Sequence, residues 1–198
     1  MTDGTDFLSQ AWYTLARAIA AAGVNADMDK TPETIAKSVN RRVRAELKRL
    51  AVLLRRLIFL MALQIELAPL KSRIGSNYYE PKRPDADYRY VFTMVPAQAG
   101  SCPHFLKGPV TVPSRGPAPA APLIARWQAM LDTMKHHQRR ARRLARTIQR
   151  WKAAGEARPH VPPIPNTHRM SAALGLISGG LTVPLIEALK DWPSADTS

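Results

Sequence analysis

This chain has a single cysteine, Cys102, among its 198 residues. One thiol cannot form an intrachain disulfide, and a zinc site built from several cysteines is excluded. Low cysteine content is typical of a reducing compartment. The N-terminal residues 1–7 carry acidic side chains where a secretory signal peptide has positive ones. We therefore expect a cytoplasmic location, with peripheral attachment to the inner membrane as the alternative.

The sequence also lacks a long, clean hydrophobic run. Residues 51–70 are apolar but interrupted by charges such as Arg55 and Arg56. Residues 170–186 carry no charge, yet they reach only the short end of the roughly 20 residues that a membrane span needs. Since glycines and a proline interrupt this second run, we expect a buried helical hairpin over 168–191 with its turn at Gly179–Gly180. A membrane contact of 170–186 is the alternative.

Motifs that carry chemistry are missing as well. The chain has no glycine-rich phosphate loop and no G-x-S-x-G nucleophile turn, and its acidic residues are sparse and dispersed. Adjacent His136 and His137 would point about 100° apart on a helix, so they do not form the i, i+4 pair of a metal site. Cys102 and His104 have no further ligands nearby. We expect no catalytic residue, no cofactor and no metal, and therefore a protein that is not an enzyme.

What the sequence does have is positive charge. It contains 29 Lys and Arg residues against 15 Asp and Glu, a formal net charge of +14. Such a surplus attracts nucleic acid, anionic lipid or an acidic protein.

Three helices are predicted from capping residues and apolar periodicity. The first covers about 6–22 and is ended by Gly23. The second begins with Thr31 as N-cap and Pro32 in the first turn, and continues to about residue 67. The third covers about 121–154 and is closed by Gly155. Because the second and third helices each combine one apolar and one basic side, we expect them to pair in antiparallel fashion.

The 17 prolines break up the rest of the chain. Residues 71–119 are predicted to form a Pro-rich insertion that is extended or partly disordered, and residues 156–167 a Pro-rich linker to the C-terminal hairpin. The alternation of residues 88–95 predicts a strand, with 105–112 as its candidate partner. The expected fold is a single mostly α domain over 1–198. It has two long antiparallel amphipathic helices, shorter helices and at most one small hairpin.

The candidate binding residues lie on the basic sides of the two long helices. No acidic residue separates Asp132 from Glu156, although ordinary surfaces intersperse both signs. Guanidinium groups match phosphate geometry. We therefore expect a nucleic-acid-binding surface without strong sequence preference, made of Arg139, Arg142, Arg143, Arg146 and Arg150, with a second patch of Arg41, Arg44, Lys48 and Arg55.

Other uses of the same residues stay open. A basic helix with Trp127 and Trp151 near its ends also suits an anionic membrane surface, and an acidic partner protein could cover the cations. The aromatic strip Tyr88–Phe92 could stack bases, although burial against a helix is the simpler interpretation. Apolar helix faces could support a homo-oligomer.

Several segments together give the chain a recognisable layout. They are the helix LLRRLIFLMAL, the Pro-rich middle, the strip YRYVF and the helix RRARRLAR. In the order of these segments, the chain resembles a loose group of uncharacterised alphaproteobacterial proteins. The resemblance implies a mostly helical layout and no particular activity.

Overall fold

The computed structural model describes residues 4–68, Tyr90, residues 92–94, residues 116–161, Ile164 and residues 167–192. The described part is mostly helical, as predicted. Its helices are α1 (Gly4–Val24), α2 (Lys37–Leu63), α3 (Ala121–Lys135), α4 (His137–Ala153) and α5 (Ala172–Ala188), with 3₁₀ turns η1 (Met28–Lys30) and η3 (Thr167–Arg169). Two short strands, β1 (Thr34–Ile35) and β2 (Ala118–Pro119), form an antiparallel pair.

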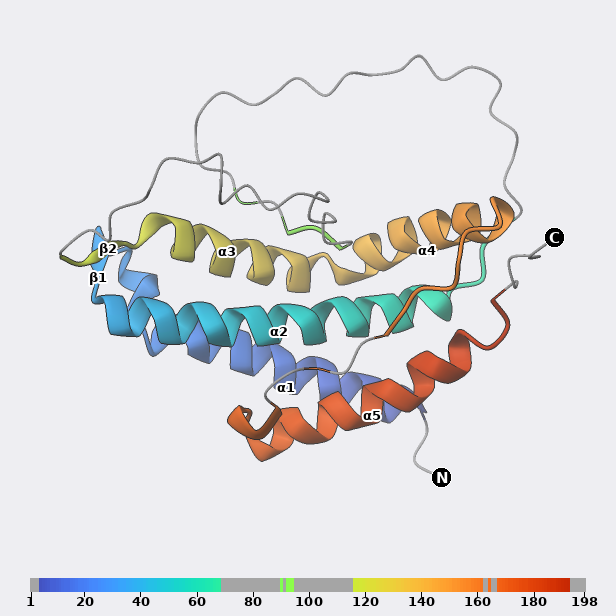
Figure 1. Cartoon of the computed structure of the whole chain (residues 1–198), viewed down its shortest axis with the longest axis horizontal. Coiled ribbons are helices and arrows are strands. Elements are labelled where there is room, and N and C mark those ends of the chain that lie inside the picture. Colours follow the sequence, from blue (N-terminus) through green and yellow to red (C-terminus); the bar gives the residue numbers. More distant parts are fainter. Residues whose placement is uncertain are drawn as a thin grey trace, which may run out of the picture.

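Helix α2 occupies the centre of the bundle, with α3 and α4 on one side and α1 and α5 on the other (Figure 1). A helix that is covered on several sides needs apolar residues around most of its circumference. The sequence supplies them in the second half of α2, where Leu53, Leu54, Leu57, Ile58 and Leu60 are all buried. These side chains belong to one hydrophobic cluster shared with the other helices.

The predicted antiparallel pairing of the two long helices is wrong. α2 and the α3–α4 pair run in the same direction (Figure 1). At their beginnings Arg44 and Leu123 line one cavity, and at their ends Gln149 Nε2 donates to the Ala68 carbonyl at 3.2 Å. Short connections favour antiparallel neighbours, whereas the long connection between Ala68 and Gly116 allows the chain to return to the starting end.

The second long helix begins later than its sequence signals predict. Thr31 is not its N-cap but has a left-handed conformation, with φ 48°. Thr34 and Ile35 instead pair with Pro119 and Ala118, and the Ala120 N–H donates to the Glu33 carbonyl at 3.0 Å. This small sheet joins segments far apart in the sequence and prevents the helix from starting before Lys37. The helix also ends at Leu63, earlier than predicted.

The third predicted helix is divided at His136. Its φ and ψ of −109° and 25° separate α3 from α4, and its imidazole Nδ1 lies 3.1 Å from the Asp132 carbonyl oxygen. Periodicity does not reveal the break, because both halves present their apolar sides to the same core. The predicted end at Gly155 is confirmed by a left-handed φ of 65° just after α4.

Two glycines predicted to interrupt helices instead allow helices to pack closely. α1 continues through Gly23, where a Cβ would collide with the indole of Trp127 on α3. α5 continues through Gly180, where a Cβ would lie 2.6 Å from the Phe7 ring on α1. The predicted C-terminal hairpin over 168–191 is therefore wrong, since one continuous helix fills most of that range.

The proline-rich segments are described only in part. Tyr90 and residues 92–94 form no strand, contrary to the alternation of 88–95, and the candidate partner 105–112 lies outside the described residues. Most of the predicted insertion 71–119 lies outside them too. In the predicted linker 156–167, the described residues up to Ile164 form neither helix nor strand, as expected.

Candidate polyanion interface

Helix α4 has a sharp division between buried and exposed sides. Ala141, Leu144, Ala145 and Ile148 are buried against the core. All five predicted binding residues of α4 are exposed. Arg143 borders a cavity described below, and we call the other four the outer face of α4: Arg139, Arg142, Arg146 and Arg150. These are neighbours at the three- and four-residue spacings that align side chains along one side of a helix.

Acidic side chains do not neutralise this surface within the described part of the chain. The ion pairs found there are Lys30–Asp27, His136–Asp132 and Arg140–Asp132. None of them involves the outer face of α4 or the predicted patch on α2. A cationic surface without such partners keeps its attraction for anions.

The second predicted patch follows one line along α2. Arg41, Arg44 and Lys48 are exposed, whereas Arg55 is half-buried. Arg44 lines a cavity of about 400 Å³ together with Tyr90 and with Arg126 of α3. Arg143, the fifth predicted residue of α4, lines another cavity beside Met94 and Arg140. Arg44 and Arg143 thus line two separate cavities, one bordered by Tyr90 and the other by Met94, and we call the line that joins these two residues between α2 and the α3–α4 pair the groove.

That groove holds the aromatic segment, by which we mean Tyr90, Phe92, Thr93 and Met94. Arg55 Nε donates to the Thr93 carbonyl at 2.8 Å, and its guanidinium lies 4.7 Å from the Phe92 ring centroid. The Arg126 guanidinium lies 5.9 Å from the Tyr90 ring centroid. Arg140 donates to the Phe92 carbonyl at 3.5 Å and to Asp132 Oδ2 at 3.0 Å. We call Arg55, Arg126 and Arg140 the clamp arginines.

The clamp arginines have a different electrostatic setting from the outer face of α4. Burial lowers the pKa of Arg55; Tyr90 opposes this shift and the nearby Arg126 adds to it. The Nε atoms of Arg126 and Arg140 are buried and have no hydrogen-bond partner among the residues that the structure describes. Interaction with ring faces and main-chain carbonyls helps to offset the cost of such burial.

Arg126 and Arg140 were not among the predicted site residues. Arg140 lies at the edge of the apolar stripe of α4, which is a signal for a side chain that turns toward the groove. Nothing in the sequence near Arg126 indicates its contact with Tyr90, because the two residues are distant along the chain. The tertiary fold alone brings them together.

Two of the other residues weighed from the sequence, Trp127 and His137, pack against neighbouring parts of the protein. The indole of Trp127 is buried and donates to the Ile19 carbonyl at 2.8 Å. The His137 ring lies 4.1 Å from that of Trp12, and its Nδ1 is 2.8 Å from the Met134 carbonyl oxygen. Cys102 and His104 lie outside the described residues.

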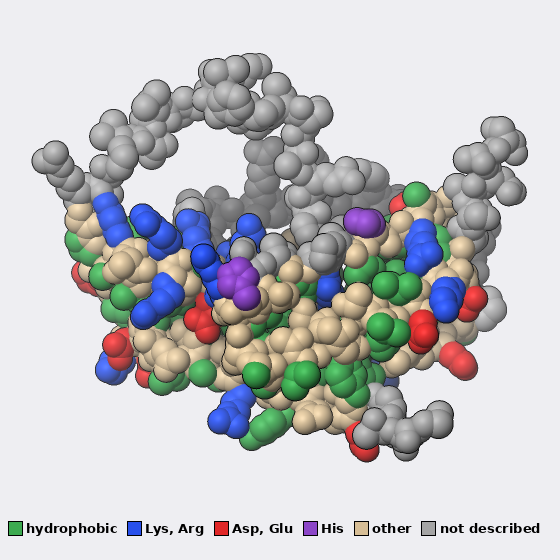
Figure 2. Space-filling model, turned by 60° about the horizontal axis from the view of Figure 1, so that its bottom comes forward, with side chains coloured by type: hydrophobic (Ala, Val, Ile, Leu, Met, Phe, Trp, Pro, Cys, Tyr) green, Lys and Arg blue, Asp and Glu red, His purple; other side chains and the backbone are tan. Residues whose placement is uncertain are grey.

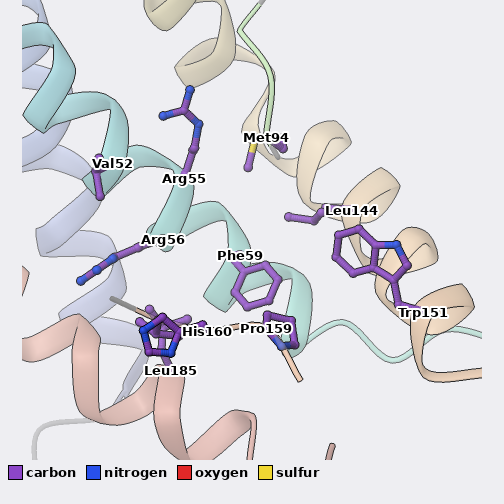
Figure 3. Close-up of a pocket in the computed structure, with 11 residues that line it drawn as sticks. Val52, Arg55, Arg56, Phe59, Met94, Leu144, Trp151, Pro159, His160 and Leu185 are labelled. Carbon is purple, nitrogen blue, oxygen red and sulfur yellow. The ribbon is translucent and has the colours of Figure 1, made fainter. Parts of the chain in front are cut away.

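A further cavity has Arg55 among its lining residues. This open apolar pocket has a volume of about 430 Å³ and is lined by residues of α2, α4 and α5, by Met94 and by residues 159–161. Figure 3 shows Arg55 and Arg56 extending from α2 in different directions, with the rings of Phe59 and Trp151 farther along the pocket. Burial lowers the pKa of Arg56, which is the one buried charged residue in the described part of the chain.

The side of the bundle formed by α1 and α5 differs from the outer face of α4 in the residues that it exposes. In Figure 2, which brings this side forward, cations gather toward the upper edge and hydrophobic side chains are spread over the lower part. Leu176 and Val183 of α5 are 77% and 60% exposed. Even so, no described helix is long and apolar enough to cross a membrane.

Comparison of this chain with protein-family models, curated proteins and solved structures found no match. The interface is therefore interpreted from its own geometry and charge.

Proposed function

We propose that this protein is a non-enzymatic, cytoplasmic binding module that holds the phosphate backbone of nucleic acid without strong sequence preference. The outer face of α4 makes the main contact. Arg143 and the exposed part of the α2 patch, Arg41, Arg44 and Lys48, extend the contact toward the groove.

The observation that carries this proposal is the exposed row of arginines on the outer face of α4. From Arg139 to Arg150 the row spans about 16 Å at the usual helical rise of 1.5 Å per residue. Duplex DNA presents one phosphate charge per about 1.7 Å of its axis. The guanidinium groups are spaced closely enough to engage several phosphates at once, and each neutralised phosphate releases counterions.

An anionic membrane surface fits the same residues less well. A helix that lies at a membrane surface inserts its apolar side into the lipid, while the cations on its polar side stay at the level of the lipid headgroups. In α4 that apolar side is already buried in the protein core. The large exposed apolar residues of the described part belong to α1 and α5, across the bundle from α4 (Figure 1).

The aromatic segment favours contact with the backbone rather than with the bases. Phe92 is buried and Tyr90 is half-buried, and each ring is close to a guanidinium group. These two rings are therefore not free to stack on bases in the way that the aromatic side chains of single-strand binders do. We therefore expect similar affinities for duplexes of different sequence.

The proposal is tested with nuclease-treated protein and fluorescently labelled duplex DNA and RNA of mixed sequence, followed by anisotropy at several salt concentrations. We expect binding at low salt and a log–log salt slope of about −3 to −5, as several phosphate contacts produce. The matched control is anionic vesicles of phosphatidylglycerol in a flotation assay. Absence of binding to both nucleic acids at low salt would exclude the proposal, and flotation without nucleic-acid binding would favour the membrane instead.

A further inference from the structure

Helix α5 is apolar on the side that the bundle buries and also on the side that it leaves open. Three large side chains on the inner side are buried: Ile177, Leu181 and Leu185. Three on the outer side are between 42% and 77% exposed: Leu176, Val183 and Ile186. A helix that is apolar all round is usually covered on several sides, as α2 is in this bundle. The outer side of α5 therefore has the composition of a surface that another element covers.

The exposed residues form a narrow stripe with one glycine in it, and we call it the α5 stripe: Leu176, Gly179, Val183 and Ile186. Their spacing of three, four and three residues is the heptad spacing along which two helices pair. A Cβ at Gly179 would meet no described atom within 4 Å, whereas the neighbouring Gly180 packs against Phe7. Glycine in a helix interior costs stability, and no contact in the described part of the chain accounts for that cost at Gly179. It leaves a hollow between larger side chains.

The α5 stripe has no charge with which to select a charged partner. Residues 170–186 are uncharged, so nucleic acid or a charged protein finds no opposite charge there. A helix that lies on a membrane surface carries Lys and Arg along its polar side. Here the nearest cations in the sequence, Arg169 and Lys190, lie beyond the two ends of α5. The stripe is therefore suited to an uncharged apolar helix.

We propose that the α5 stripe pairs with the same stripe of a second copy in antiparallel fashion, which forms a dimer with two-fold symmetry. Leu176 then lies beside the partner's Ile186, and Val183 enters the hollow at the partner's Gly179. The two-fold axis repeats both contacts. This dimer does not rest on the proposed nucleic-acid contact, because α5 lies across the bundle from α4 (Figure 1).

The charges just beyond the ends of α5 favour the antiparallel direction. Arg169 and Asp191 are both exposed, and neither takes part in the ion pairs of the described residues. In the antiparallel register Arg169 lies near the partner's Asp191 at each end of the interface. A parallel pair would instead bring like charges together, which is unfavourable.

The size of the contact predicts a weak dimer. Helix α5 has 17 residues, which is about 25 Å at a rise of 1.5 Å per residue. One helix from each copy is a small contact beside the roughly 1,200–2,000 Å² of a stable interface. We therefore expect a dissociation constant of about 10–100 μM.

The test is sedimentation velocity of the full-length, nuclease-treated protein from about 1 to 300 μM, a range that brackets the expected dissociation constant. We expect the mass to rise from that of one chain toward that of two. A monomer throughout this range would overturn the proposal, whereas DNA binding by the outer face of α4 would be unaffected.

Matched substitutions locate the interface. Val183→Glu puts a charge in the middle of the α5 stripe and should weaken the dimer about tenfold or more, because two like charges would be buried together. Val24→Glu makes the same change at a similarly exposed residue of α1, 56% against 60%, and should leave the affinity within about twofold. Circular dichroism establishes that both variants are folded. Equal effects of the two substitutions would overturn the interface.

A charge exchange tests the direction of the pair. Arg169→Glu should weaken the dimer about threefold to tenfold, since an exposed ion pair contributes little but occurs twice here. Adding Asp191→Arg restores opposite charges and should recover most of the affinity; a double variant as weak as the single one would overturn the antiparallel register. Flotation of the wild type with phosphatidylglycerol vesicles that is lost in Val183→Glu, without self-association, would assign the stripe to a lipid surface instead.

Discussion

The clamp arginines and the outer face of α4 contain the same residue type in two different settings. Arg55 and Arg140 reach inward to the main-chain carbonyls of Thr93 and Phe92. Arg139 and Arg146, on the same helix as Arg140, project into solvent without an acidic partner in the described part of the chain.

The difference shows that a count of arginines overstates the available binding surface. A guanidinium that is held by carbonyls and rings stabilises the fold, because it orders a segment far away in the sequence. An exposed guanidinium contributes little to stability and keeps its hydrogen bonds for a ligand. The predicted patch on α2 contains both types, since Arg55 is a clamp arginine whereas Arg41 is exposed.

The largest expected effect comes from removing the outer face. The quadruple variant replaces all four arginines of this face with glutamine: Arg139→Gln, Arg142→Gln, Arg146→Gln and Arg150→Gln. It should lower the affinity for duplex DNA about a hundredfold or more at 0.1 M salt, because several phosphate contacts are lost. Its free energy of unfolding should stay within about 0.5 kcal/mol of wild type. Anisotropy and urea denaturation measure the two quantities.

The control for this variant replaces the same four residues with lysine. Lysine keeps the charge and has a similar helix propensity, so most of the affinity should return. If the glutamine variant binds as tightly as wild type, the outer face is not the interface.

A smaller effect, on stability, is expected from Arg55→Ala. The substitution removes the hydrogen bond to Thr93 and the contact with the Phe92 ring. We expect a loss of about 1–2 kcal/mol in the free energy of unfolding, measured by urea denaturation. Arg41→Ala, on an exposed part of the same helix, should change it by less than about 0.5 kcal/mol. Equal effects of the two substitutions would remove the distinction between clamp and exposed arginines.

The smallest effect concerns the carboxylate that Arg140 contacts. The hydrogen bond that Arg140 donates to Asp132, together with the nearby His136, lowers the pKa of the Asp132 carboxyl group. Because the pKa of Asp132 is lower in the folded state, its ionised carboxylate stabilises the fold at pH values above its ordinary pKa near 3.8. This stabilisation is lost as the pH falls through the lowered pKa. Arg140→Ala should raise this pKa toward its ordinary value, as measured by a carboxyl-carbon NMR titration. Arg139→Ala, one residue away, should leave it unchanged.

Local signals in the sequence were sufficient for much of the helical content. The stop at Gly155 is correct because a left-handed residue at a helix end is a local property. The buried side of α4 is also correct, because periodicity specifies which residues share a side. By contrast, the Thr31–Pro32 start signal failed because β1 pairs with a strand more than eighty positions away.

Glycine was the least informative residue type at the level of sequence. Gly23 and Gly180 resemble helix-ending residues, yet they allow Trp127 and Phe7 to approach a neighbouring helix. Conformational freedom and lack of a side chain are two properties of the same residue. Only the position of the neighbouring helix decides which of them matters.

The sequence by itself determined that the chain is mostly helical, strongly basic, and divided along α4 into an apolar and a cationic side. The tertiary structure decided that α2 runs parallel to α3 and α4, and that Arg55, Arg126 and Arg140 meet around the aromatic segment. Helix periodicity and charge are local properties, whereas direction and contact depend on how a long connection returns the chain. A sequence pattern cannot specify that return, because the energy that selects it comes from packing between distant segments.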